Sequence, residues 1–239
     1  MDELNALPFS KRREQKQSFK QFREVLRLII FCHRKKLQEK DTVSLLEILE
    51  KTGITPEDYM KYRLVKDHLR KYKQLFPAIA HLYFLYETGE YDRDKEKETF
   101  NDIAVYSITV GRAWKLSEGH DDEDYYFSFE CKRLKDLGKN QLYIDQGIRK
   151  YVENAYARAM PFAGMIGFVE SGDIVRIKDD INLRLSKSNQ TGELITIEIL
   201  RFFEVEENFE FSYSSKHERI QNSPIALYHL FFDYSSLLL

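Results

Sequence analysis

The stretch from Tyr125 to Lys132 constrains the fold most, because its side chains alternate in character with a period of two. Such alternation predicts a β-strand with two chemically different faces. The apolar face holds Phe127, Phe129 and Cys131, and the polar face holds Ser128, Glu130 and Lys132. A strand of this kind needs an apolar layer packed against one of its faces, so it belongs to a sheet that is covered on that side.

A helix and a second strand follow. Residues 138–156 carry apolar side chains at helical spacing and end before Pro161, and residues 163–169 form the continuous apolar run typical of a buried central strand. Residues 172–185 predict another helix. The other predicted strands are residues 103–110, 194–203, 209–213 and 225–234. This order predicts a mixed α/β (α+β) fold, in which helices flank a mixed sheet.

The first hundred residues have helical patterns instead. Residues 19–37 show apolar spacings of three and four, and a second helix is expected between Thr42 and Gly53. Thr55, followed by Pro56 and two acids, predicts the start of a third helix that continues to about Phe76.

The end of this helical half is predicted from charge. An apolar stretch over residues 79–86 leads into the charged run 90–98, which we interpret as a loop or the end of a helix. The chain is therefore expected to divide into a helical, basic N-terminal domain of residues 1–98 and a sheet-containing domain of residues 99–239.

The near-neutral net charge of -2 hides an asymmetry between the two halves. Residues 1–80 contain 18 Lys and Arg against 11 Asp and Glu, and residues 11–40 contain 11 against three. A basic segment of this kind attracts polyanions such as nucleic acid, although a solvated helix face is an equally good interpretation. Two cysteines exclude a disulfide framework, and we find no secretory signal or membrane span, so a cytoplasmic protein is expected.

Glu130 and Lys132 lie on the same face of the predicted strand, where charge is costly to bury unless that face meets solvent, a ligand or a metal. Asp102, immediately before the preceding predicted strand, is the candidate for a second carboxylate. Two carboxylates suit Mg²⁺ or Mn²⁺, and Lys132 is placed to orient or help deprotonate a metal-bound water and to offset phosphate charge. This set predicts metal-assisted phosphodiester hydrolysis, with Asp102, Glu130 and Lys132 as catalytic residues and the two acids as metal ligands.

Several segments carry a resemblance to a known family: Tyr126 to Leu134, Tyr143 to Ile148, Ala163 to Val169, Ser215-x-His217-x-Arg219 and Tyr228-His229-Leu230. Together they resemble the PD-(D/E)xK nuclease superfamily, as found in restriction and phage-defence systems. The resemblance covers residues 100–234 and implies a restriction-endonuclease-like fold for residues 99–239. It also implies Asp102 and Glu130 as metal ligands and Lys132 as the catalytic lysine.

Other residues compete for these roles. An acid from the run Asp121 to Asp124 is an alternative first metal ligand, although a solvated turn explains that run more simply. His217 and His229 are interpreted as structural residues, and Cys131 as a small core residue. Cys32 and His33 lack further zinc ligands at suitable spacing.

Two functions from different classes follow. The first is a metal-dependent endonuclease that acts on DNA in anti-phage or foreign-DNA defence. The second is a catalytically inactive nuclease-like module that binds nucleic acid or scaffolds a multi-protein defence complex. A protein partner is compatible with either function, and no contact with a membrane is expected.

Overall fold

The structure is a computed structural model that describes residues 9–44, 48, 53–92, 97–107, 126–155, 158, 160–170, 173–220 and 222–238. The N-terminal part of the described chain is helical. A long helix, α1 (Phe9–Glu39), precedes a second helical segment that changes its winding along its length. That segment comprises α3 (Pro56–Arg63), the π-helical η2 (Leu64–Leu69), α4 (Arg70–Tyr72) and the 3-10 turn η3 (Lys73–Leu75).

A seven-stranded mixed sheet forms the centre of the described structure, in the order β1-β2-β3-β4-β7-β6-β5. The strands β3, β4 and β7 run parallel, and the other neighbouring pairs are antiparallel. The strands are β1 (Tyr83–Asp92), β2 (Lys97–Tyr106), β3 (Tyr126–Leu134), β4 (Phe162–Val169), β5 (Thr196–Phe202), β6 (Ser212–Arg219) and β7 (Asn222–Asp233).

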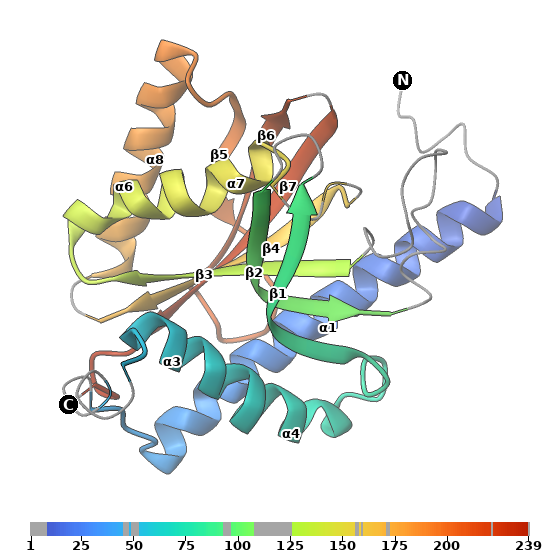
Figure 1. Ribbon diagram of the computed structural model, residues 1–239, viewed down its shortest axis with the longest axis vertical. Helices are drawn as coiled ribbons and strands as arrows, with labels where there is room; N and C mark the ends of the chain where they lie inside the picture. The colour runs from blue at the N-terminus through green and yellow to red at the C-terminus, as the bar shows by residue number, and fades with distance from the viewer. Residues whose placement is uncertain are drawn as a thin grey trace.

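Helices cover both faces of the sheet (Figure 1). On the upper face in this view lie α8 (Ile174–Thr191) and the irregular helix made of η5 (Leu137–Lys139), α6 (Asn140–Tyr143), η6 (Ile144–Ile148) and α7 (Arg149–Val152). On the lower face lie α1 and the helix that begins with α3. The site described below is at β3, between these two layers.

The core joins the helical N-terminal part directly to the sheet. Phe22 of α1 is completely buried, and its ring lies 5.4 Å from that of Phe127, 5.5 Å from Phe129 and 4.8 Å from Phe162. Buried residues of α1, η2 and all the central strands belong to one hydrophobic cluster. Burial of large aromatic side chains is the main stabilising term for such a core.

The mixed-sheet class is confirmed, as are the helix over residues 19–37, the helix start at Thr55 and the strands at β3 and β4. Most of the helix expected between Thr42 and Gly53 lies outside the described residues.

The helical interpretation of residues 79–86 is wrong. The described residues of the charged run 90–98, predicted as a loop or the end of a helix, belong to strands. Residues 83–92 form β1, which pairs with β2, so a β-hairpin crosses residue 98, where the sequence predicts a boundary. Phe84 is buried while its neighbours Tyr83 and Leu85 are exposed, which is the alternation of a strand with only one covered face. The strand predicted at residues 209–213 is displaced too, because β6 begins at Ser212 and carries His217 within it.

Candidate active site

The two faces of β3 differ as the alternation predicts. Phe129 points to α1, whereas Glu130 and Lys132 lie on the opposite face, which α6, η6 and α7 cover. Both charged side chains are buried: Glu130 is 0% exposed and Lys132 is 8% exposed. Buried charges of this kind are tolerated only when they are paired, and their partners define the site.

The ammonium group of Lys132 lies among three carboxylates. Its Nζ is 2.7 Å from Glu130 Oε1, 3.4 Å from Glu57 Oε1 and 3.9 Å from Asp102 Oδ2. The structure therefore brings the three residues selected from the sequence together, and it adds Glu57 from α3. The catalytic and metal-binding roles of these residues remain a proposal.

Both oxygens of Asp102 have donors. Lys61 Nζ donates to Oδ1 at 2.8 Å, and the backbone N–H of Cys131 donates to Oδ2 at 2.6 Å. Lys61 is itself buried and also pairs with Asp58 Oδ1 at 2.7 Å. Asp102 is thus fixed between α3 and β3.

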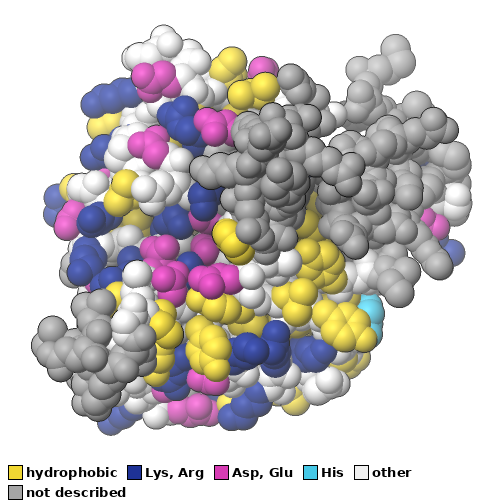
Figure 2. Space-filling model, in the orientation of Figure 1, with side chains coloured by type: hydrophobic (Ala, Val, Ile, Leu, Met, Phe, Trp, Pro, Cys, Tyr) yellow, Lys and Arg dark blue, Asp and Glu magenta, His cyan; other side chains and the backbone are white. Residues whose placement is uncertain are grey.

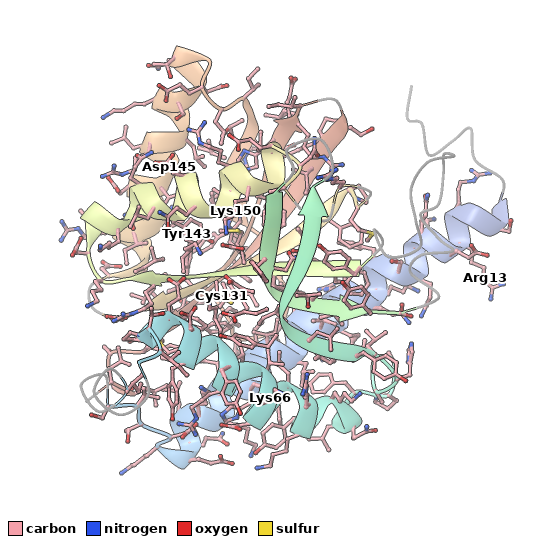
Figure 3. All side chains as sticks on the ribbon, in the orientation of Figure 1. Arg13, Lys66, Cys131, Tyr143, Asp145 and Lys150 are labelled. Carbon is pink, nitrogen blue, oxygen red and sulfur yellow. The ribbon has the colours of Figure 1, made fainter. Side chains whose placement is uncertain are left out.

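Glu130 has a second cation. Lys150 Nζ, from α7, lies 2.8 Å from Glu130 Oε1, the same oxygen that Lys132 contacts. Lys150 and Cys131 are both labelled near the middle of the view, close to β3 (Figure 3). The side chain of Lys150 is 37% exposed, so the site opens to solvent on the side of α7.

The cluster carries a small net negative charge. It contains the carboxylates of Glu57, Asp58, Asp102 and Glu130 and the ammonium groups of Lys61, Lys132 and Lys150, so its net charge is -1 when every group is ionised. A residual negative charge favours the binding of a further cation or of a protonated group.

Sequence reasoning missed the contribution of α3. Thr55 caps this helix by accepting a hydrogen bond from the N–H of Asp58, as predicted. The acids of the first turn, however, also reach β3, where Glu57 Oε2 accepts the N–H of Arg133 at 3.1 Å. Glu57 lies 76 residues from Arg133 in the sequence, and no local pattern signals such a contact.

The electrostatic environment raises the pKa of the buried acid and of the two buried lysines alike. Burial raises the pKa of Glu130, and the nearby Asp102 carboxylate adds to this effect. Burial disfavours the ammonium form of Lys132, but the carboxylates of Glu130, Asp102 and Glu57 outweigh it and raise the pKa of Lys132 above its ordinary value. Lys61 behaves likewise beside Asp102, because the carboxylate outweighs burial and raises the pKa of the lysine. Both lysines are therefore ammonium ions at neutral pH.

The carboxylate oxygens of the site are chemically suited to a hard cation, but their arrangement is not. Glu57, Asp102 and Glu130 offer only oxygen atoms, which Mg²⁺ prefers. Among the described residues, however, no group of three or more carboxylate, histidine or cysteine side chains is arranged to hold a metal ion. In this arrangement lysine ammonium groups contact the carboxylate oxygens that a metal needs. The acids Asp121 to Asp124, the alternative source of a ligand, lie outside the described residues.

The late histidines belong to a buried polar chain. The hydroxyl of Ser215 lies 2.8 Å from His229 Nε2 and 2.7 Å from His217 Nε2. The other ring nitrogens bond Tyr143 at 2.9 Å and Thr196 at 3.1 Å. Burial lowers the pKa of His217 to about 3 and that of His229 well below its ordinary value, so both are neutral and structural, as predicted.

Cys131 is a core residue, as predicted. Cys131 is completely buried in the core, and burial raises the pKa of its thiol, which makes it a poor nucleophile. Cys32 is buried too, and its neighbour His33 stacks on Tyr234 at 5.4 Å.

The basic segment of residues 11–40 lies away from the carboxylates, because α1 covers the opposite face of the sheet. Part of its charge is neutralised within the chain: Arg27 Nε pairs with Glu206 Oε2 at 2.7 Å, and Arg23 donates to the carbonyl of Glu204 at 2.9 Å. The interpretation of these basic residues as a helix face without a nucleic-acid ligand thus explains part of the segment. The segment does not line the site.

Comparison with protein-family models, with curated proteins and with solved structures finds no match to this chain. None of the helices in the described part of the chain combines the length and the apolar character that crossing a bilayer requires.

Proposed function

We propose that this protein is a metal-dependent nuclease of the PD-(D/E)xK type that hydrolyses phosphodiester bonds of DNA in defence against foreign genomes. The observation that carries the proposal is the position of Lys132 Nζ within 3.9 Å of carboxylate oxygens from Glu57, Asp102 and Glu130. These residues come from three separate elements, and two of them were selected as metal ligands from the sequence.

The element order supports the finer fold assignment. Three antiparallel strands, β1 to β3, are followed by a helix and by β4, which runs parallel to β3. Asp102 lies on β2, and Glu130 and Lys132 lie on β3, within residues 99–239, for which we propose the restriction-endonuclease-like fold. Pairing of β1 with β2 adds residues 83–92 and 97–98 to that unit.

In this mechanism Asp102 and Glu130 would hold Mg²⁺ or Mn²⁺, and the ion would supply Lewis-acid activation of a water molecule and of a phosphoryl oxygen. Glu57 would be the nearest further carboxylate on Lys132. Lys132, held as an ammonium ion, stabilises the negative charge that develops on the phosphate. Its raised pKa favours this role over that of a general base. Lys150, the most exposed of the three lysines, is placed to contact the phosphate from the solvent side.

A specific observation favours the inactive module as the second candidate. Every carboxylate of the cluster is already paired with an ammonium group, and Glu130 is completely buried. A site that is neutralised by its own lysines has less need of a metal. On this interpretation the cluster holds α3 against the sheet, and the fold serves for binding.

The test is a cleavage assay on linear DNA, circular DNA and RNA with Mg²⁺ or Mn²⁺. Under the nuclease proposal, wild-type protein cleaves, while Glu130→Gln and Lys132→Ala abolish cleavage although both variants remain folded by circular dichroism. Lys216→Ala, which removes an exposed lysine from β6, is the matched control and retains full activity. Cleavage that persists in folded Glu130→Gln and Lys132→Ala refutes the assignment. Absence of cleavage by metal-replete wild-type protein favours the module.

A further inference from the structure

The helix that begins at the candidate site becomes strongly basic after its first turn. Residues 61–73 contain six Lys and Arg against one Asp. Within this stretch Lys66 and Lys71 are exposed, and Lys66 forms no ion pair among the described residues. Figure 3 places Lys66 on the surface of this helix, on the side that faces the viewer. The helix therefore extends a positive surface away from the carboxylates.

Exposed aromatic side chains lie beside this positive surface. Tyr62 is 44% exposed and Tyr83 is 69% exposed. Phe100, which is 51% exposed, lies farther along the hairpin, opposite Gly89 of β1. The Tyr62 ring meets that of Tyr86 edge-on at 5.9 Å, and Lys73 Nζ lies 5.7 Å from the centre of the Tyr83 ring. Figure 2 shows hydrophobic side chains gathered over β1, right of centre, with Lys and Arg side chains below them. We call this surface, made of Tyr62, Lys66, Tyr83 and Phe100, the aromatic-basic face.

The aromatic-basic face is not suited to the addition of a further strand. β1 is an edge strand, but Arg70 donates from both Nε and Nη2 to the carbonyl of Phe84, at 2.9 and 2.7 Å. Lys73 donates to the carbonyl of Leu82 at 2.7 Å. Backbone carbonyls at a sheet edge that are already bonded to charged side chains are poor templates for another β-strand. The side chains around this edge, rather than its backbone, are therefore free to bind a partner.

The aromatic-basic face is continuous with the candidate active site. Glu57, Asp58 and Lys61 occupy the first turns of the same helix that carries Tyr62 and Lys66. The hydroxyl of Tyr86, beside Tyr62, donates to the carbonyl of Asp58 at 3.3 Å. The aromatic-basic face therefore shares one helix with three charged residues of the cluster.

We propose that the aromatic-basic face binds an unpaired polynucleotide strand, with bases stacked on Tyr62, Tyr83 and Phe100 and with phosphates on Lys66 and Lys71. Exposed rings beside lysines suit this ligand, because every base presents a face for stacking and every linkage presents a charge. Bases in a duplex are stacked on one another and have no face to offer. The inference rests on the proposed nuclease function, and it specifies a single-stranded segment as the substrate that this site receives.

The experiment measures binding without cleavage. Fluorescein-labelled oligo-dT and oligo-rU of about 15 nucleotides, together with a duplex of the same length, are titrated with full-length protein in EDTA, and fluorescence anisotropy is recorded. Tyr83→Ala is expected to weaken single-strand binding roughly five- to a hundredfold, the range for the loss of one stacked base. Tyr83→Phe keeps the ring and binds as wild type. Lys66→Ala lowers the slope of log Kd against log salt by about 0.7.

The controls lie at the other end of the sheet. Phe202→Ala removes a side chain that is 61% exposed on β5, and Lys216→Ala removes an exposed lysine on β6; both are expected to bind as wild type. Equal binding by folded Tyr83→Ala and wild type overturns the inference, as does tighter binding of the duplex. Binding of oligo-dT, oligo-rU or both supports it and identifies the polymer.

The two proposals fail separately. If single strands bind through Tyr83 and Lys66 but no polymer is cleaved in Mg²⁺ or Mn²⁺, the surface stands and the nuclease proposal fails. If DNA is cleaved and Tyr83→Ala alters neither binding nor KM, the nuclease stands and the surface is refuted. The inference is also refuted if this protein binds no single strand and instead binds a second polypeptide on the aromatic-basic face.

Discussion

Replacement of Lys132 by methionine tests the electrostatic description of the site. Methionine keeps an unbranched apolar side chain of similar length, so the change removes the charge with little loss of packing. The charge of the cluster falls from -1 to -2 because one of its three ammonium groups is lost. Glu130 still contacts Lys150, and Asp102 still contacts Lys61. Glu57, however, loses its contact with the ammonium group of Lys132.

The magnitude follows from the distances. At an effective dielectric constant of about 20, the pair of 2.7 Å between Lys132 and Glu130 contributes about 6 kcal/mol of attraction, and the pair of 3.9 Å with Asp102 about 4 kcal/mol. Desolvation of the buried ammonium offsets several kcal/mol of this attraction. Because Lys150 still neutralises Glu130, we expect a net loss of about 3 kcal/mol, the lower end for a broken buried ion pair.

The assay is thermal and urea unfolding of wild type, Lys132→Met and the exposed control Lys216→Met. A loss of about 3 kcal/mol corresponds to a fall in Tm of roughly 6–12 °C for a chain of this size. If the freed carboxylates bind a divalent cation, Mg²⁺ at about 100 times its Kd restores about 2.7 kcal/mol, and the gain is larger than for wild type. Unchanged stability without metal refutes the electrostatic reasoning. A gain from Mg²⁺ no larger than that of wild type refutes the metal site.

Three further predictions concern the scaffold. Burial lowers the pKa values of His217 and His229 below that of an unfolded histidine, so the unfolded chain binds more protons than the folded chain. The free energy of unfolding is therefore expected to fall as pH drops from about 6.5 toward 3. A Tm that does not fall between pH 7 and pH 5 contradicts this prediction. Gly164→Ala places a methyl group against the ring of Phe129 and is expected to cost about 1–3 kcal/mol in urea unfolding. The thiol of Cys131 reacts with a thiol reagent only after unfolding, so rapid labelling of that residue in native protein argues against its buried position.

Local patterns were sufficient for the elements that carry their own signal. The alternation from Phe127 to Lys132 predicted which side chains of β3 face the core and which face the site, because successive residues of a strand point to opposite sides. The cap at Thr55 and the buried run of β4 were likewise predicted, since capping and continuous burial depend on neighbouring residues.

The prediction failed at β1, where the same aromatic and aliphatic residues suit a helix or a strand. Tyr83 to Tyr86 become a strand because β2 supplies hydrogen-bond partners and Arg70 covers a carbonyl on the open edge. Pairing of this kind is decided by neighbours in space, which a short apolar run does not identify.

The sequence by itself determined the class of fold and the two faces of β3. It also determined that a carboxylate and a lysine share one of those faces. Only the tertiary structure decided which other charges complete the cluster, because Glu57 and Lys61 reach it from a helix that is distant in sequence. It also placed α1 on the far face, where Arg27 meets Glu206. Electrostatic interactions act through space and fall with distance between side chains, not with separation along the chain.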